Sequence, residues 1–228
     1  MIIGIHTPVF AFEHVASNVR AAVKRLGIKY PVVQDNRFKT WDNYSNQYWP
    51  AEYLIDKTGH VRHTHFGEGR YGETEQLIRQ LLGAHGAKSA QMPDTTPTGL
   101  LTPETYLGYQ RLDNYVGTPV SPDIVGSYRL PSELPQNTIA YGGQWKLDPE
   151  RATAVRDSHL ALHFHARNVY IVLGGHGTVR ASIDDTVVKT IPVTAQKLYT
   201  VRASKRTADT TVDLAFTPGV QAYSFTFG

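Results

Sequence analysis

Cysteine is absent from the 228 residues of this sequence. The thiolate is the reacting group in thiol–disulfide exchange and in disulfide formation, so this chain by itself is expected to do neither. Long hydrophobic runs are absent as well, because no stretch reaches the 18 or so apolar residues that a membrane-spanning helix needs. The first residues, MIIGIH, are too short and lack the basic start of a signal peptide, so we expect none in this chain.

A strong excess of one charge is also lacking. Lys and Arg number 23 against 20 Asp and Glu, which gives a formal net charge of +3, and the charges are spread along the chain. Nucleic-acid-binding domains usually cluster their positive charge, so nucleic acid is not an expected partner. The glycine-rich turn at residues 67–72 lacks the Lys-Ser/Thr of a phosphate-binding loop, and no cofactor is expected.

The length is sufficient for one large domain or two modest ones. Residues 84–103 are rich in Ala, Thr, Pro and Gly and show no hydrophobic periodicity, which predicts a linker. The sequence therefore predicts two domains, residues 1–83 and residues 104–228.

The first of these stretches reads as mixed α/β structure. Apolar residues recur at spacings of three and four before Gly27, which is typical of an amphipathic helix with a glycine at its C-terminus. Pro50 stands directly before an apolar run, where a residue without an N–H marks the first position of a strand, and an aromatic residue before proline raises the cis fraction. The predicted elements are a strand at 2–7, a helix at 12–26, an extended segment at 28–35, a helix at 41–47, strands at 52–56 and 61–66, and a helix at 73–82.

Several motifs carry a family resemblance. Residues 40–69, TWDNYSNQYWPAEYLIDKTGHVRHTHFGEG, resemble the second half of a thioredoxin-like domain of the TlpA/ResA type, in which a cis-proline introduces a strand of the form xLID-xx-G-xV. Together, YWPAEYLID, FGEGRYGETE, LTPETYLGY and the terminal YSFTFG are similar to the C-terminal, extracytoplasmic part of DipZ-type proteins. In that family a TlpA-like thioredoxin module is followed by a β-sandwich that resembles a carbohydrate-binding module.

The resemblance implies a parent protein that transfers reducing equivalents by thiol–disulfide exchange outside the cytoplasm and receives electrons through a membrane domain. It places Trp49 and Pro50 beside the redox groove. Residues 1–83 lack the first strands and the Cys-x-x-Cys helix of such a module. Either an upstream segment or separate chain carries them, or this is a cysteine-free relative used for binding. The first explanation is favoured, because the remaining strands would otherwise have long unpaired edges, and the chain alone is then expected to be inactive.

The second stretch, residues 104–228, reads as all-β. Short runs rich in Val, Ile, Tyr, Thr and Leu alternate with turn residues, which predicts an antiparallel sandwich or jelly roll. The predicted strands are residues 105–109, 126–129, 138–142, 143–147, 158–165, 168–173, 178–183, 186–191, 197–201, 211–216 and 222–227.

Two binding alternatives remain open for this stretch. Tyr141 and Trp145 are the predicted sugar-stacking rings of a glycan- or cell-wall-binding module, with Trp145 expected to face outward. His159, His163 and His165 fall on one face of a strand because the side chains alternate. His163-Phe164-His165 is similar to the first motif of cupin-type metal sites. The Glu expected after that pair is missing, so the predicted site contains no metal, and a metal on His163 and His165 is kept as an alternative.

Overall fold

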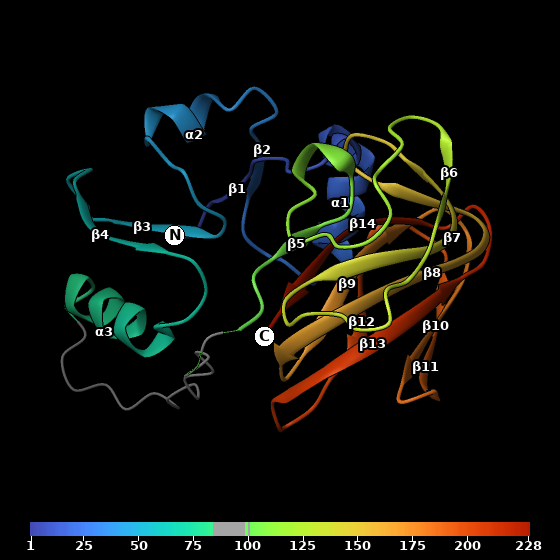
Figure 1. Ribbon diagram of the computed structural model, residues 1–228. Helices are drawn as coiled ribbons and strands as arrows, with labels where there is room; N and C mark the ends of the chain where they lie inside the picture. Colours follow the sequence, from blue (N-terminus) through green and yellow to red (C-terminus); the bar gives the residue numbers. More distant parts are fainter. Residues whose placement is uncertain (84–98, 100) are drawn as a thin grey trace. The chain divides into compact units, whose positions relative to one another are not determined.

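The computed structural model describes residues 1–83, 99 and 101–228 (Figure 1). Contacts divide the described chain into two units. The small unit comprises residues 1–8, 29–83 and 99, and the large unit comprises residues 9–28 and 101–228. Most of the predicted linker lies outside the described residues. No helix in the described part is long and apolar enough to cross a membrane.

The small unit contains two separate pieces of sheet. β1 pairs with β2 in parallel, and β3 pairs with β4 in antiparallel. Apart from Pro8, none of the apolar side chains described in this unit is buried. The unit therefore contains the predicted helices and strands but no apolar core of its own. Its elements are β1 (Gly4–His6), β2 (Val32–Gln34), α2 (Lys39–Asn43), β3 (Ala51–Ile55), β4 (Val61–Phe66) and α3 (Tyr71–Leu81).

The first helix of the chain belongs to the large unit. The predicted helix at residues 12–26 is present as a short 3₁₀ helix, η1 (Ala11–His14), followed by α1 (Ala16–Arg25). The two are separated at Val15, whose backbone is extended. Glu13 stabilises the entry, because its carboxylate accepts hydrogen bonds from the backbone N–H groups of Val9 and Phe10. Gly27 follows the helix with φ of 66°, as expected for a residue that ends a helix.

The rest of the large unit is mostly antiparallel β-structure, as the sequence predicts. Its ten strands form one connected sheet. Seven of them are neighbours in the order β11-β10-β13-β8-β14-β9-β12. The other three join this row at its side, since β7 pairs with β8, β6 pairs with β7, and β5 pairs with β14. The elements are β5 (Thr105–Tyr106), η2 (Tyr109–Arg111), β6 (Val125–Tyr128), β7 (Ile139–Leu147), β8 (Ala152–Ala166), β9 (Val169–Gly174), β10 (Gly177–Ile183), β11 (Thr186–Val193), β12 (Lys197–Arg202), β13 (Ala208–Phe216) and β14 (Gln221–Phe227).

One strand runs where the sequence predicts two. Residues 138–142 and 143–147 were predicted as separate runs, yet β7 is continuous through Gly142 and Gly143. Gly143 has φ of 77°, and a Cβ there would lie 1.8 Å from the carbonyl oxygen of Asp157 on β8. A glycine therefore lets β7 continue past the point where β8 bulges, because the register shifts place the extra residues on β8.

The long strand β8 organises the core of the large unit. It lies between β7 and β13 along much of its length, and the long strands β8 and β13 run together in Figure 1. Alternation buries Leu160, Leu162 and Phe164 and turns the three histidines between and beside them to the opposite face. Because the apolar side chains of β8 face the core, its histidine side chains are held on the opposite face of the strand.

Candidate functional site

Trp49 and Pro50 lie at the start of β3 in the small unit. The Trp49–Pro50 peptide bond is cis. The Trp49 side chain is 48% exposed, its ring centroid lies 4.1 Å from that of Trp41, and its Nε1 donates to the Thr7 carbonyl oxygen at 3.2 Å. The Pro50 carbonyl oxygen accepts a bond from the Gly67 N–H at 2.8 Å. These contacts hold a half-exposed indole at the entry of the β3–β4 hairpin.

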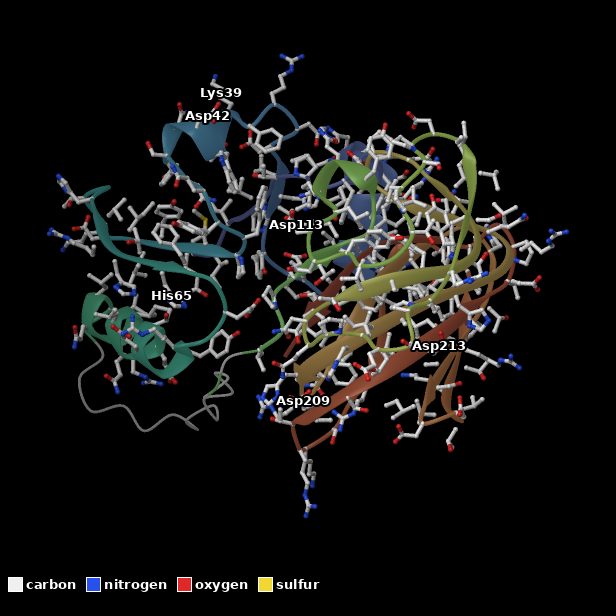
Figure 2. All side chains as sticks on the ribbon, in the orientation of Figure 1. Lys39, Asp42, His65, Asp113, Asp209 and Asp213 are labelled. Carbon is white, nitrogen blue, oxygen red and sulfur yellow. The ribbon has the colours of Figure 1, made fainter. Side chains whose placement is uncertain are left out.

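His65 on β4 is the most unusual polar group of the small unit. It pairs across the hairpin with Glu52, and Thr74 of α3 donates to the Glu52 carboxylate at 3.2 Å. His65 is only 9% exposed, and its Nε2 is buried without a hydrogen-bond partner among the described residues. Figure 2 labels it in the small unit. A buried nitrogen without a hydrogen-bond partner costs free energy, and His65 Nε2 is such a nitrogen on this face of the hairpin.

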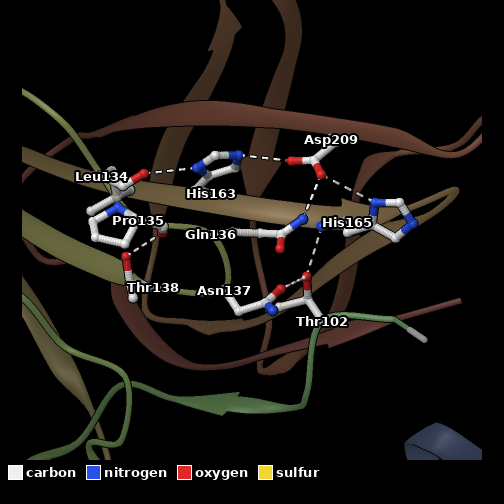
Figure 3. Close-up of polar contacts among 9 residues, drawn as sticks. All are labelled: Thr102, Leu134, Pro135, Gln136, Asn137, Thr138, His163, His165 and Asp209. Carbon is white, nitrogen blue, oxygen red and sulfur yellow. Dashed lines mark hydrogen bonds and ion pairs between the residues drawn. The ribbon is translucent and has the colours of Figure 1, made fainter.

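A second polar group, which we call the Asp209 cluster, lies on the large unit and consists of Leu134, Gln136, His163, His165 and Asp209 (Figure 3). His163 on β8 contacts an Asp209 carboxylate oxygen on β13 at 2.8 Å through Nε2 and the Leu134 carbonyl oxygen at 2.7 Å through Nδ1. Gln136 donates to the other Asp209 oxygen, which also lies 3.4 Å from His165 Nδ1. The hydrogen bond from His163 holds the pKa of Asp209 below its usual value.

Thr102, near the start of the second stretch of the large unit, is hydrogen-bonded to residues beside this cluster. Thr102 Oγ1 accepts a bond from the His165 N–H at 2.7 Å and donates to Asn137 Oδ1 at 2.7 Å. Thr102 is buried, although the sequence analysis assigned it to the linker. The physical reason is that its N–H and hydroxyl are both bonded to the end of β8. The linker prediction therefore extends slightly too far.

A family model described as "Thioredoxin like C-terminal domain" matches residues 102–228, which is more than half of the chain. The chain belongs to this family. The match begins at Thr102, the residue that the hydrogen bonds attach to β8. The family's domain therefore coincides with the β-structure of the large unit.

Similar proteins extend the comparison to the small unit. DipZ from Mycobacterium bovis and DipZ from Mycobacterium tuberculosis are each 43% identical to this member of the thioredoxin-like C-terminal family, across all of its length and 34% of theirs. The chain thus spans about a third of the length of these relatives. The resemblance to the DipZ type is confirmed. NHL repeat-containing protein 2 from Bos taurus is 33% identical over 69 residues, covering 30% of this chain and 10% of that protein.

The sugar-binding prediction for this family member is wrong in its residues. Tyr141 and Trp145 both lie on β7 and are 0% exposed. Tyr141 donates its hydroxyl to the Leu107 carbonyl oxygen at 2.6 Å, and Trp145 Nε1 donates to the Gly142 carbonyl oxygen at 2.9 Å. Rings that are enclosed by the core and bonded internally cannot stack on a sugar.

The common face of the three histidines, which alternation along the strand predicts, is present in the structure. His159, His163 and His165 share one face of β8, and each contacts a carboxylate of β13. In the part of the chain that the structure describes, no group of three or more His, Cys, Asp or Glu has the arrangement of a metal site. What the alternation could not reveal is the identity of the partners, Asp209 and Asp213, which come from a strand more than 40 residues away.

The His159–Asp213 pair gives a prediction about pH. The hydrogen bond to Asp213, 2.8 Å from His159 Nδ1, raises the pKa of His159 above its usual value, against the effect of burial. A histidine whose pKa is raised by folding stabilises the folded state below its unfolded pKa, and this contribution disappears as the pH rises through the folded pKa. The free energy of unfolding should therefore fall between about pH 6 and pH 8. Because the His159 side chain is 41% exposed, we expect a contribution of only about 0.5 kcal/mol.

Urea titrations at several pH values test this contribution. In Asp213→Asn the decrease in unfolding free energy over that pH range should be shallower than in the wild type. The reason is that the variant lacks the carboxylate charge that raises the pKa of His159. His176→Gln, at an exposed histidine of the β9–β10 turn, is the matched control and should leave the slope unchanged. An Asp213→Asn slope equal to that of the wild type would show that the pair does not titrate in this range.

Proposed function

We propose that this chain is the cis-proline half of a DipZ-like thiol–disulfide redox module together with the β domain that follows it. The observation that carries the proposal is the state of the small unit. Its two pieces of sheet are separate, and its described apolar side chains other than Pro8 are all at least partly exposed. A strand between β1 and β3, with a helix packed over it, would join the two pieces and bury those side chains. In thioredoxin-like modules of this type that strand and helix carry the Cys-x-x-Cys pair.

The division of roles follows from the chemistry. Disulfide exchange needs a thiolate, and this sequence has no cysteine. The chain would contribute the docking side of the active site, with Trp49 and Pro50 presenting an extended backbone next to the reacting sulfurs. By itself it would be inactive. In the parent protein the module would work on the extracytoplasmic side and receive electrons from a membrane domain.

For the large unit we propose a carbohydrate-binding-module-like β-sandwich. The support is one contiguous apolar cluster, to which alternate residues of β7, β8, β9 and β13 contribute together with Ala222 and Phe225 of β14. Binding of a glycan itself is not proposed on Tyr141 and Trp145, since both rings are enclosed.

Insulin-disulfide reduction tests the redox proposal. We expect the chain alone to give the rate of the blank. A fusion that places the strand and Cys-x-x-Cys helix of DipZ ahead of Met1 should reduce insulin clearly above the blank. The same fusion with both cysteines replaced by serine is the matched control and should be inactive.

Amide hydrogen exchange separates completion of the fold from activity. In the fusion, the amides of β1 and β3 should become protected relative to the chain alone, because their free edges are then paired. Protection without turnover would reject the redox role while supporting the missing strand. Unchanged exchange with no turnover would reject both, as would turnover by the chain alone.

A further inference from the structure

We propose that one end of the large unit is a membrane-contact surface that binds the phosphate groups of anionic lipid headgroups. This surface, which we call the basic tip, consists of Arg167, Arg202, Lys205 and Arg206. Its binding to lipid does not depend on the redox proposal. In a parent protein with the proposed membrane domain, the basic tip would hold the large unit at the bilayer surface.

The fold brings the four cations together from two turns, one between β8 and β9 and the other between β12 and β13. In the β8–β13 ladder Ala166 pairs with Ala208, and in the β9–β12 ladder Val169 pairs with Arg202. Both turns therefore lie at the same end of the sheet, although 35 residues separate Arg167 from Arg202. Charges that are spread along the sequence thus become neighbours in the fold.

The Arg202 guanidinium joins the two turns to each other. It donates to the backbone carbonyl oxygen of Arg167 in the first turn and, from Nη1 at 3.3 Å, to that of Arg206 in the second. A second link is the hydrogen bond from the Ser204 N–H to Asn168 Oδ1 at 3.1 Å. The turns are thus held together by fixed contacts, and the positive charge of Arg202 meets carbonyl oxygens there instead of a carboxylate.

The basic tip has no acidic partner among the described residues. Lys205 and Arg206 are exposed and Arg167 is partly exposed, and none of the four cations forms an ion pair with a carboxylate in that part of the chain. The first carboxylate that follows them on β13, Asp209, is bonded to His163 instead. Like charges gathered in this way repel one another, and an anionic partner removes that repulsion.

A bilayer fits this surface better than a nucleic acid does. Proteins that bind single strands stack the bases on aromatic rings, whereas the two turns, residues 166–168 and 203–207, contain no aromatic residue. Two tight turns also do not supply the helix or β-ribbon that enters a duplex groove. A bilayer needs neither, since an anionic leaflet attracts clusters of about four or more Lys and Arg through their charge. Its dense phosphates let all four cations act together.

Co-sedimentation of the full chain with vesicles tests the proposal. Vesicles of phosphatidylglycerol and phosphatidylcholine in equal parts should bind the chain at low salt. Pure phosphatidylcholine should bind it more than about tenfold more weakly, because each Lys or Arg near an anionic surface changes partitioning about fivefold. High salt should release the chain from the mixed vesicles, since it screens exposed charges. A chain that stays in the supernatant with the mixed vesicles at low salt would overturn the proposal.

Variants that remove charge locate the contact. The double variant Lys205→Gln, Arg206→Gln should bind the mixed vesicles about 25-fold more weakly, at about fivefold per charge. The matched double variant Arg20→Gln, Lys24→Gln removes the same charge from exposed positions of α1 and should bind as the wild type does. Circular dichroism establishes that both variants are folded. Equal losses of binding in the two would mean that binding follows net charge alone, which contradicts a site at the basic tip.

Soluble competitors separate the bilayer from other sources of phosphate. Inorganic phosphate at the phosphate concentration of the lipid should leave vesicle binding unchanged, because a single ion does not contact all four cations. Release of the chain by inorganic phosphate would assign the basic tip to a soluble phosphate compound. Tighter binding to a single-stranded oligonucleotide than to the mixed vesicles, at equal phosphate concentration, would assign it to nucleic acid. Either result would overturn the lipid proposal.

Discussion

Replacing Trp145 with alanine should destabilise the large unit by about 3–5 kcal/mol, the range for deleting a fully buried large aromatic side chain. The ring is 0% exposed and lies between Tyr141, at 5.3 Å between centroids, and Phe216, at 5.0 Å. Its Nε1 also donates to the carbonyl oxygens of Gly142 and His159 at 2.9 and 3.2 Å. Truncation therefore leaves a cavity and two carbonyls that lose a donor. Urea denaturation followed by circular dichroism measures the loss.

Two further variants serve as controls for Trp145→Ala. Trp145→Phe retains an aromatic ring but not the N–H, and it should cost clearly less than the alanine variant. Leu198→Ala removes an apolar side chain that is exposed on β12, and it should change the unfolding free energy by about 0.5 kcal/mol or less. If Trp145→Ala behaved like Leu198→Ala, the indole would not be part of the core. A loss of sugar binding in Trp145→Ala would be no evidence of a sugar site, since the variant is expected to unfold easily.

The sequence contained the signal for this burial. Ile139, Tyr141, Trp145 and Leu147 all occupy odd positions, and an unbroken strand turns them to one face. Dividing the run at Gly142-Gly143 hid that periodicity, because a glycine pair reads locally as a turn. The close approach of Gly143 to Asp157, which a Cβ at position 143 would block, joins residues of different strands. A pattern within a few residues of the sequence therefore does not reveal it.

Local patterns predicted most of the elements and few of their partners. The strands and helices come from periodicity, from glycine and from proline, all of which act within a few residues. The common face of His163 and His165 likewise follows from alternation along β8. Asp209 joins these two rings only through the β8–β13 register, in which His165 pairs with Asp209. Register between distant strands is a property of the whole sheet, so no short motif records it.

Phe10 gives the second large expected effect. The sequence analysis assigned residues 1–83 to one domain, whereas contacts group Val9–Ile28 with the β-structure of the large unit. Phe10 is 4% exposed, and its ring lies 5.4 Å from that of Tyr223 and 6.2 Å from that of Tyr106. The Arg111 guanidinium lies 5.4 Å from the same ring. The Phe10 ring therefore anchors this segment to β5 and β14, together with Phe12, whose ring stacks on Phe10 at 5.8 Å and lies 5.1 Å from that of Tyr223.

Phe10→Ala should detach residues 9–14 locally, at a cost of about 3 kcal/mol. The reporter is the Ala11 amide, which donates to the Glu150 carboxylate at 2.8 Å and should exchange about a hundredfold faster in the variant. Val15→Ala, at a 48% exposed position of the same segment, is the matched control and should leave Ala11 protected.

The pattern of exchange decides what the Phe10 ring does. Faster exchange confined to residues 9–14, with β8 and β13 unaffected, means that the ring anchors a segment to an independently stable sheet. Faster exchange throughout the sheet would instead place Phe10 in the core of the large unit, because its loss would then lower global stability. Unchanged exchange at Ala11 would contradict the anchoring role, since the Glu150 bond and the Arg111 contact to the Val9 carbonyl oxygen would then suffice.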